Sequence, residues 1–411
     1  MALSDLSTWL DEYARPGFVW LAKRLAANDT LASNAHQAGP YIPREFLFAM
    51  FPSINRPGAE NPDAWFDLYV DSHASHRNVR AVWYNNRLRD GTRNETRLTN
   101  FGGRDSPLLD PESTGALAVF VFVKHPDLDA AECHVWLSRN AIEEDLVEDR
   151  IGPVEPGKLR IWSVEGGDQA ELFAAPAPER TACHLEPEEI PGEWLIRFPA
   201  GAEIVAKAME FRPGHGVSSD LRLIRRRECE FEIFRSLEQA VELPVIRRGF
   251  GTIDDFLARA QTILQRRKSR SGRSLELHTR EIFMEDGLVE NMHFSYQPVS
   301  EPGKSPDFLF PSGEAYRNAA FADEGLRMLA VKTTCKDRWR QILNEADRVQ
   351  IKHLLTLQEG VSENQFREMT ESGVRLVVPA TLHQAYPPAI RPHLQTLAEF
   401  IGHVQQLAVS D

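Results

Sequence analysis

Apolar and polar positions follow two different periods along this chain. Between about residue 40 and about residue 170, short runs rich in Val, Phe, Trp and Tyr are separated by Gly, Pro and Asn turns; examples are residues 66–70, 80–84, 115–123 and 133–137. Many short strands at close spacing predict a barrel or a sandwich. After about residue 220, apolar residues at helical spacing alternate with short apolar runs. This alternation predicts an α/β core.

The two patterns also predict where elements and domains begin and end. A helical segment is expected from Leu6 to Leu25, interrupted at residues 15–17. A stretch rich in proline and charge separates the two halves, so we expect a mostly-β domain over 1–175, a linker over 176–191 and an α/β domain over 192–411. Within the second domain, helices are expected over 221–240, 253–268 and 274–286, and strands near 293–297, 307–310, 327–332, 353–357 and 375–378.

Composition limits the kind of protein this is. A chain of 411 residues is too long for one core, which agrees with two domains. The net charge of −13, taken alone, argues against nucleic-acid binding. Binding depends on local charge, however, and basic clusters at 225–227, 247–248 and 266–270 permit it without establishing it. The chain has no apolar run of about 18 residues, so no membrane span is expected.

The four cysteines are far apart and form no CxxC pair. Structural zinc and a disulfide framework are therefore not expected, and a reducing cytoplasm fits this usage. No glycine-rich GK[ST] loop is present, so the sequence does not indicate a nucleotide cofactor.

Two apolar runs bring chemically useful residues to their ends. Asp307 opens the run 307–310, and Lys332 follows the run 328–331. A carboxylate on one strand beside a lysine on the next suits metal-dependent phosphodiester hydrolysis. The carboxylate can hold Mg²⁺, which polarises the scissile phosphate, and the lysine can orient water or stabilise charge on phosphorus. Taken singly, Asp307 could equally be a turn residue and Lys332 a solvent-facing strand end.

Two further acids are candidates for the same site. Residues 338–348 are predicted to form an amphipathic helix, and Glu345 lies about 100° from the centre of its apolar stripe, where a side chain can turn inward. Glu276 is predicted near the start of the helix over 274–286. The alternative for Glu276 is a favourable acid near a helix N-terminus.

These residues resemble the PD-(D/E)xK nuclease superfamily, with one departure. The superfamily usually carries its second acid two residues before the lysine, where this chain has Ala330, and Glu345 is expected to replace it. Residues 332–347, with 274–278 and 306–312, resemble the EcoRII family of type IIE restriction endonucleases over nearly the whole chain. The resemblance implies Glu276, Asp307, Lys332 and Glu345 as catalytic residues, with Asp307 and Glu345 as ligands of Mg²⁺.

The triplet Lys336-Asp337-Arg338 follows the catalytic lysine closely. Lysine and arginine read guanine in the major groove, while aspartate accepts a hydrogen bond from cytosine N4. The resemblance implies contacts to outer C:G pairs, so that correct readout would be coupled to the geometry of the metal site. The alternative is helix capping by Asp337.

Arg93, Glu95 and Arg97 alternate along an extended segment, so they share one side. Without further information this segment would be an exposed hairpin with cross-strand ion pairs. The resemblance implies a B3-like effector pseudobarrel that grips DNA with two arms, and it implies these DNA-binding residues: Lys23, Arg24, His36, Tyr41, Arg93, Glu95 and Arg97. Lysines of the family's second arm are replaced here by Gly91 and Thr96, which predicts fewer phosphate contacts.

Together these features predict a Mg²⁺-dependent endonuclease that cuts double-stranded DNA at a CCWGG-like site and leaves 5′-phosphates. The resemblance implies activation by a second copy of the site bound to the effector domain, and cutting by a homodimer. The alternatives are a non-catalytic two-site DNA-binding protein and a repair-type nuclease of the same fold.

Overall fold

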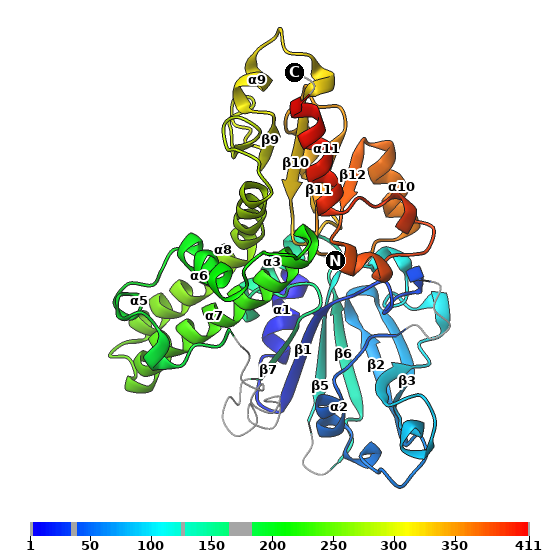
Figure 1. Ribbon diagram of the computed structural model, residues 1–411. Helices are drawn as coiled ribbons and strands as arrows, with labels where there is room; N and C mark the ends of the chain where they lie inside the picture. Colours follow the sequence, from blue (N-terminus) through cyan, green and yellow to red (C-terminus); the bar gives the residue numbers. More distant parts are fainter. Residues whose placement is uncertain (1–2, 34–38, 125–127, 164–182, 410–411) are drawn as a thin grey trace. The chain divides into compact units, whose positions relative to one another are not determined.

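The computed structural model describes residues 3–33, 39–124, 128–163 and 183–409. The chain divides into two compact units, each with its own sheet (Figure 1). Unit 1 comprises Met1–Ala177, Gln358–Glu368 and Gln384–Pro392. Unit 2 comprises Pro178–Leu357, Met369–His383 and His393–Asp411.

Unit 1 is built on a curled sheet of seven strands in the order β4-β3-β2-β6-β5-β1-β7 (Figure 1). Neighbouring strands are antiparallel except for the parallel pair β2 and β6. The elements are α1 (Leu3–Tyr13), β1 (Phe18–Arg24), α2 (Arg44–Met50), β2 (Asp63–Val70), β3 (Ser75–Tyr84), β4 (Glu95–Thr99), β5 (Leu117–Val123), β6 (Glu132–Leu137), α3 (Ala141–Ile151) and β7 (Leu159–Ser163).

The central strands of this sheet are buried on both faces, which explains their continuous apolar sequence. In β5, Phe120 and Phe122 pack into one core with Phe46 of α2. The alternate residues, including Val119, pack into a second core with Trp9 of α1. The four predicted strand segments are therefore confirmed.

The helical segment predicted from Leu6 to Leu25 is wrong in its second half. The helix ends at Tyr13, Gly17 takes a left-handed φ of +89°, and strand β1 follows. A strand buried on both faces has no alternation of polar and apolar residues, so its sequence can resemble a helix.

Unit 2 is built on a sheet of five strands in the order β12-β11-β10-β9-β8, with β10, β11 and β12 parallel and β8 and β9 antiparallel. All five strands lie where the sequence predicts them. The elements are α5 (Gly192–Ile196), α6 (Gly201–Phe211), α7 (Ser219–Arg248), α8 (Ile253–Glu285), β8 (Ser295–Tyr296), β9 (Phe308–Phe310), α9 (Gly313–Arg317), β10 (Arg327–Val331), β11 (Lys352–Leu355), α10 (Glu363–Glu371), β12 (Val374–Val377) and α11 (Leu397–Val409).

The two helices predicted over 253–268 and 274–286 form one helix, α8, of 33 residues. The polar segment between them continues as helix because α7 supplies partners for its arginines. Arg267 pairs with Glu238, and Arg270 pairs with Glu230, which is 1% exposed. Tertiary ion pairs thus override the weak helical propensity of Gly272.

Cys183 and Cys229 form a disulfide, with 5.2 Å between their Cα atoms. The expectation that this chain has no disulfide is therefore wrong. The bridge joins the segment before α5 to α7, across 46 residues of sequence, and no spacing rule predicts such a pair. The other two cysteines, Cys133 and Cys335, are buried and are not part of a disulfide. Within the described residues, no helix is both long enough and apolar enough to span a membrane.

Candidate active site

Asp307 and Lys332 meet at neighbouring strand ends in unit 2. Asp307 directly precedes β9, and Lys332 directly follows β10, its antiparallel neighbour. The Lys332 Nζ lies 3.1 Å from Asp307 Oδ2, and the same oxygen accepts a 2.7 Å hydrogen bond from the amide of Val331. Asp307 is 8% exposed, and these two contacts fix the position of its carboxylate.

The amphipathic α-helix predicted over 338–348 is wrong. Residues Arg338–Asn344 form a 3-10 helix, η9, and Glu345 ends it in an extended conformation. In a 3-10 helix, residues i and i+3 lie on one line, and Trp339 and Ile342 are indeed the two buried residues of η9. The apolar spacing of this segment therefore fits either helix type, and the sequence could not distinguish them.

Glu345 lies close to the first two residues. Burial raises the pKa of its carboxyl, the charge of Lys332 opposes that rise, and the charge of Asp307 adds to it. The Glu345 Oε2 atom is buried and has no hydrogen-bond partner among the described residues. A buried oxygen without a partner is costly unless something else binds it.

The turn that carries Glu345 is held by an internal lysine. Lys352, 6% exposed at the start of β11, donates hydrogen bonds to the carbonyl oxygens of Glu345, Ala346 and Val349. Ala346 has a left-handed φ of +49°, which a non-glycine residue adopts only when its surroundings enforce it. Burial lowers the pKa of Lys352.

Glu276, the fourth candidate, comes from α8. Its Oε2 accepts hydrogen bonds from Tyr296 Oη at 3.1 Å and from Gln297 Nε2 at 2.9 Å. Burial raises the pKa of Glu276, the Asp307 charge raises it further, and the Lys332 charge lowers it. Because α8 begins at Ile253, Glu276 lies far inside the helix, and the alternative of an acid at a helix N-terminus is wrong.

The donor set suits a hard divalent cation. Asp307 and Glu345 offer carboxylate oxygens, and one of these, Glu345 Oε2, has no partner in the described chain. No group of three or more His, Cys, Asp or Glu residues that could hold a metal ion occurs among the described residues. Mg²⁺ fits such a site, since it commonly binds one or two carboxylates and takes its other ligands from water and phosphate.

The triplet at 336–338 follows Lys332 and ends at Arg338, the first residue of η9. Asp337 occupies the N-cap position of η9, but its side chain makes no capping hydrogen bond there. Its Oδ1 lies 3.6 Å from Nη1 of Arg340 instead. The capping alternative for Asp337 therefore has no support in the geometry.

In unit 1 the structure brings four of the proposed DNA-binding residues together. Lys23 pairs with Asp29 at 2.7 Å and donates a hydrogen bond to the Tyr41 carbonyl oxygen. Tyr41 forms a β-bridge with Arg97, and Arg97 pairs with Glu95 at 3.2 Å. Glu95 and Arg97 share one side of the edge strand β4, as their alternation predicts.

The remaining effector residues are placed differently. Arg24 lies on the opposite face of β1, 5% exposed, and its guanidinium is bound by Glu144 and Glu148 of α3. Arg93 lies over the ring of Tyr84, 5.2 Å from its centroid. His36 lies outside the described residues.

Gly91 and Thr96, the two departures from the family's second arm, have structural reasons of their own. A Cβ at Gly91 would come within 2.7 Å of the Asn86 side chain. Thr96 is 1% exposed, and its hydroxyl donates to the Ile42 carbonyl oxygen.

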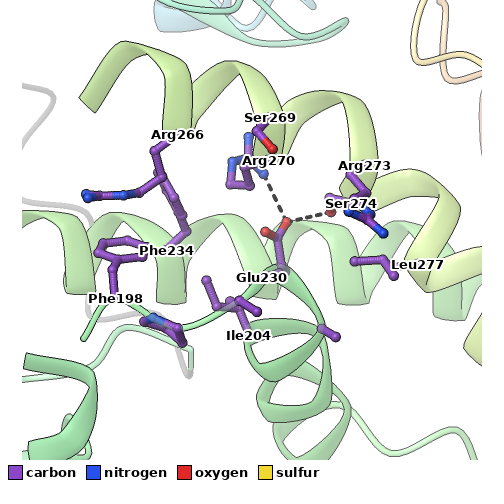
Figure 2. A pocket seen from close by; sticks show the side chains of 14 residues that line it. Phe198, Ile204, Glu230, Phe234, Arg266, Ser269, Arg270, Arg273, Ser274 and Leu277 are labelled. Atoms are coloured by element: carbon purple, nitrogen blue, oxygen red, sulfur yellow. Dashed lines mark hydrogen bonds and ion pairs between the residues drawn. The ribbon is translucent and has the colours of Figure 1, made fainter. Parts of the chain in front are cut away.

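A cavity of about 380 Å³ lies elsewhere in unit 2, between α6, α7 and α8. Figure 2 shows Glu230 accepting hydrogen bonds from Arg270 and Ser274 beside apolar side chains. Three arginines line it: Arg270 pairs with Glu230, Arg266 pairs with Glu242, and Arg273 is the third.

A carboxylate and a lysine at neighbouring strand ends, with one acid from a turn and one from a helix, indicate the class: a metal-dependent nuclease of the restriction-endonuclease fold. Comparisons with known proteins identify the family. The model "EcoRII C terminal" matches residues 234–401, and "Restriction endonuclease EcoRII, N-terminal" matches residues 14–166. The chain is 44% identical over 409 residues to the "Type II restriction enzyme EcoRII" of Escherichia coli, which covers 99% of each chain.

The chain belongs to the EcoRII family of type II restriction enzymes, and it is an EcoRII-like type IIE site-specific deoxyribonuclease. This confirms the resemblance, the B3-like and α/β fold classes and the DNA partner. Among solved structures, metal-depleted Ecl18kI in complex with uncleaved DNA is 19% identical, with a TM-score of 0.40, over 55% of this chain and 86% of that one. The UbaLAI B3 domain with cognate DNA is 20% identical, with a TM-score of 0.27, over 38% and 98%.

Proposed function

We propose that this enzyme hydrolyses double-stranded DNA at a CCWGG-like site with Mg²⁺, through Glu276, Asp307, Lys332 and Glu345. The observation that carries the proposal is the 3.1 Å pair of Asp307 and Lys332, with a buried, unpartnered Glu345 oxygen near it. When bound by Asp307 and Glu345, Mg²⁺ would polarise the scissile phosphate and make water a better nucleophile. The enzyme would work in the bacterial cytoplasm, where its substrate lies.

Lys332 and Glu276 have separate roles in the proposed reaction. Lys332, kept in place by Asp307, orients the attacking water and stabilises the negative charge that develops on the phosphate oxygens. In-line attack leaves a 5′-phosphate. Glu276, which has a raised pKa and two hydrogen-bond donors on one oxygen, orients the metal site through water.

Base readout is proposed for Lys336, Asp337 and Arg338, which lie where the chain passes from Lys332 into η9, the 3-10 helix that Glu345 follows. Because the same short segment would contact bases and carry a metal ligand, correct base contacts would favour correct site geometry. Arg338→Ala is expected to lose both discrimination and cognate cleavage, by about 1–3 kcal/mol for one guanine contact. Full cleavage by this variant at saturating enzyme, with weakened binding, would disprove the coupling.

For the effector domain, we propose residues 1–175, with Lys23, Arg24, His36, Tyr41, Arg93, Glu95 and Arg97 in the DNA interface. The cluster of Lys23, Tyr41, Glu95 and Arg97 supports this, whereas Arg24 would first have to leave its two glutamates. A site bound here would activate cutting of a second site by the catalytic domain, residues 192–411, across the linker 176–191. Adding a site-bearing duplex in trans should then accelerate cleavage of a one-site plasmid, and Arg97→Ala should abolish that acceleration.

A homodimer is proposed because a palindromic target favours a two-fold enzyme. The tip of the α7–α8 hairpin offers a surface for it. There Ile246, Ile253, Phe256 and Leu257 expose between 47% and 78% of their area. Clustered exposed apolar side chains are typical of interaction surfaces.

The decisive experiment is digestion of a long DNA with Mg²⁺, followed by sequencing of the ends. Discrete fragments with a common site and 5′-phosphates are expected. Binding without nicking would favour the non-catalytic alternative, and random fragment sizes would favour a repair-type nuclease.

A further inference from the structure

Gln297 contacts one of the candidate catalytic carboxylates, although no sequence pattern marks it. Its side-chain Nε2 donates to Glu276 Oε2 at 2.9 Å, the same oxygen that accepts from Tyr296 Oη at 3.1 Å. The Glu276 Oε1 atom accepts neither of these bonds. Two donors on one oxygen fix the rotation of a carboxylate more firmly than either donor alone.

The backbone of Gln297 is unusual at the same place. Its φ is +48°, in the left-handed region that residues other than glycine, asparagine and aspartate seldom adopt. Such conformations persist only where neighbouring contacts enforce them, and they cluster at functional sites.

Those neighbouring contacts belong to the segment that leads into Asp307. The Gln297 amide donates to the Asp307 carbonyl oxygen at 2.9 Å, and Ser305 Oγ donates to the Gln297 carbonyl oxygen at 2.9 Å. Gln297 thus bonds Asp307 through its main chain and Glu276 through its side chain. It joins a residue of α8 to a residue at the start of β9 that is distant in sequence.

We propose that Gln297 is a positioning residue, which holds the Glu276 carboxylate in register with Asp307 and Lys332. This inference rests on the proposed role of those three residues in DNA hydrolysis. Gln297 is largely exposed, so a role in packing the core does not explain its strained backbone.

The test compares Gln297→Ala with Gln261→Ala, an exposed glutamine on α8, the helix that carries Glu276. For Gln297→Ala, kcat on a cognate duplex should fall about tenfold, the effect of losing one hydrogen bond to a charged group. Its KM and its metal-free DNA affinity should stay within about twofold of the parent values. Its thermal midpoint should stay within about 2 °C of that of the parent. Gln261→Ala should match the parent enzyme in every measurement.

Two further variants separate the side chain from the backbone. Gln297→Gly relieves the left-handed conformation but lacks the amide, so it should lose as much kcat as Gln297→Ala. Gln297→Glu keeps the length but places a second carboxylate against Glu276, so its loss should be larger. Tyr296→Phe removes the other donor to the same oxygen and should lower kcat in the same direction.

Parent-like kcat in Gln297→Ala or Gln297→Glu, or full recovery in Gln297→Gly, would overturn the inference. Equal losses of metal-free DNA affinity and kcat would also overturn it, because they would show a DNA contact instead. Glu276→Gln, measured in parallel, distinguishes a failure of the proposed role of Glu276 from a failure of the positioning role of Gln297. If it cuts normally, the proposed role of Glu276 is wrong; if it fails to cut while Gln297→Ala cuts normally, only the positioning role is wrong.

Discussion

Burial determines the chemical properties of several single residues in this protein. Ala330, fully buried in β10, occupies the position where related nucleases usually carry an acid, so the sheet itself supplies no second carboxylate. Glu345 reaches the site from a separate turn, and Cys335 between them has its pKa raised to about 12 by burial. That thiol stays protonated near neutral pH, which suits a buried packing residue.

The buried His353 predicts how the free energy of unfolding depends on pH. Burial lowers its pKa to about 3, and the charges of His403, Arg375 and Arg327 act in the same direction. The unfolded chain takes up this proton below about pH 6.5, while the folded chain does not, so the free energy of unfolding falls as pH falls through that range. Between pH 6.5 and pH 5 the loss from His353 should be about 2 kcal/mol. Urea unfolding at both pH values measures it.

His353→Leu should remove this part of the pH dependence, and His293→Leu, in a loop of the same unit, serves as its control. An unchanged slope in His353→Leu would contradict the assignment.

At the scale of elements, the sequence predicts the positions of strands better than it predicts the tertiary contacts that decide the type and length of a helix. The five strands of unit 2 were located because buried strands are short apolar runs between turn residues. The segment before Glu345 is a 3-10 helix instead of the predicted α-helix, because the spacing of Trp339 and Ile342 suits both helix types. Helix α8 is one helix instead of the predicted two, because glutamates of α7 stabilise its arginines. Tertiary partners of this kind carry no local signal.

The same limit applies to the candidate site. Asp307, Lys332 and Glu345 could be proposed because strand ends and family motifs mark them. Tyr296, Gln297 and Lys352 could not, since only the folded chain creates their contacts: the first two donate to the Glu276 carboxylate, and Lys352 donates to the Glu345 carbonyl oxygen.

Lys352 yields a prediction for the turn that it holds. Lys352→Met keeps the volume but leaves three carbonyl oxygens without their donor, so unfolding should cost about 2–4 kcal/mol less and cleavage should fall more than DNA binding does. Lys304→Met is the control, since that lysine pairs only with the exposed Asp347 among its described ion pairs. Parent-like cleavage by Lys352→Met would show that the turn keeps its shape without the lysine.

At the scale of the whole molecule, the Cys183–Cys229 bridge fixes the beginning of unit 2 to α7. Closing a long loop in the unfolded chain typically stabilises a protein by about 2–4 kcal/mol. Reduction of the oxidised enzyme should therefore lower the thermal midpoint of unit 2 by roughly 5–10 °C. Cys183→Ser should show the lower midpoint with or without reductant, while Cys133→Ser should respond to reductant as the parent does. A parent midpoint that reductant leaves unchanged would contradict this.

The proposed mechanism requires Glu345 to act with Asp307 and Lys332, although Glu345 comes from a different segment. Its most direct test is single-turnover cleavage of a cognate duplex by Glu345→Gln with Mg²⁺, together with DNA affinity measured without metal. The variant should bind DNA like the parent and cut it about a thousandfold more slowly, because a metal ligand is lost while the shape of the site remains. Cleavage at the parent rate would contradict a catalytic role for Glu345.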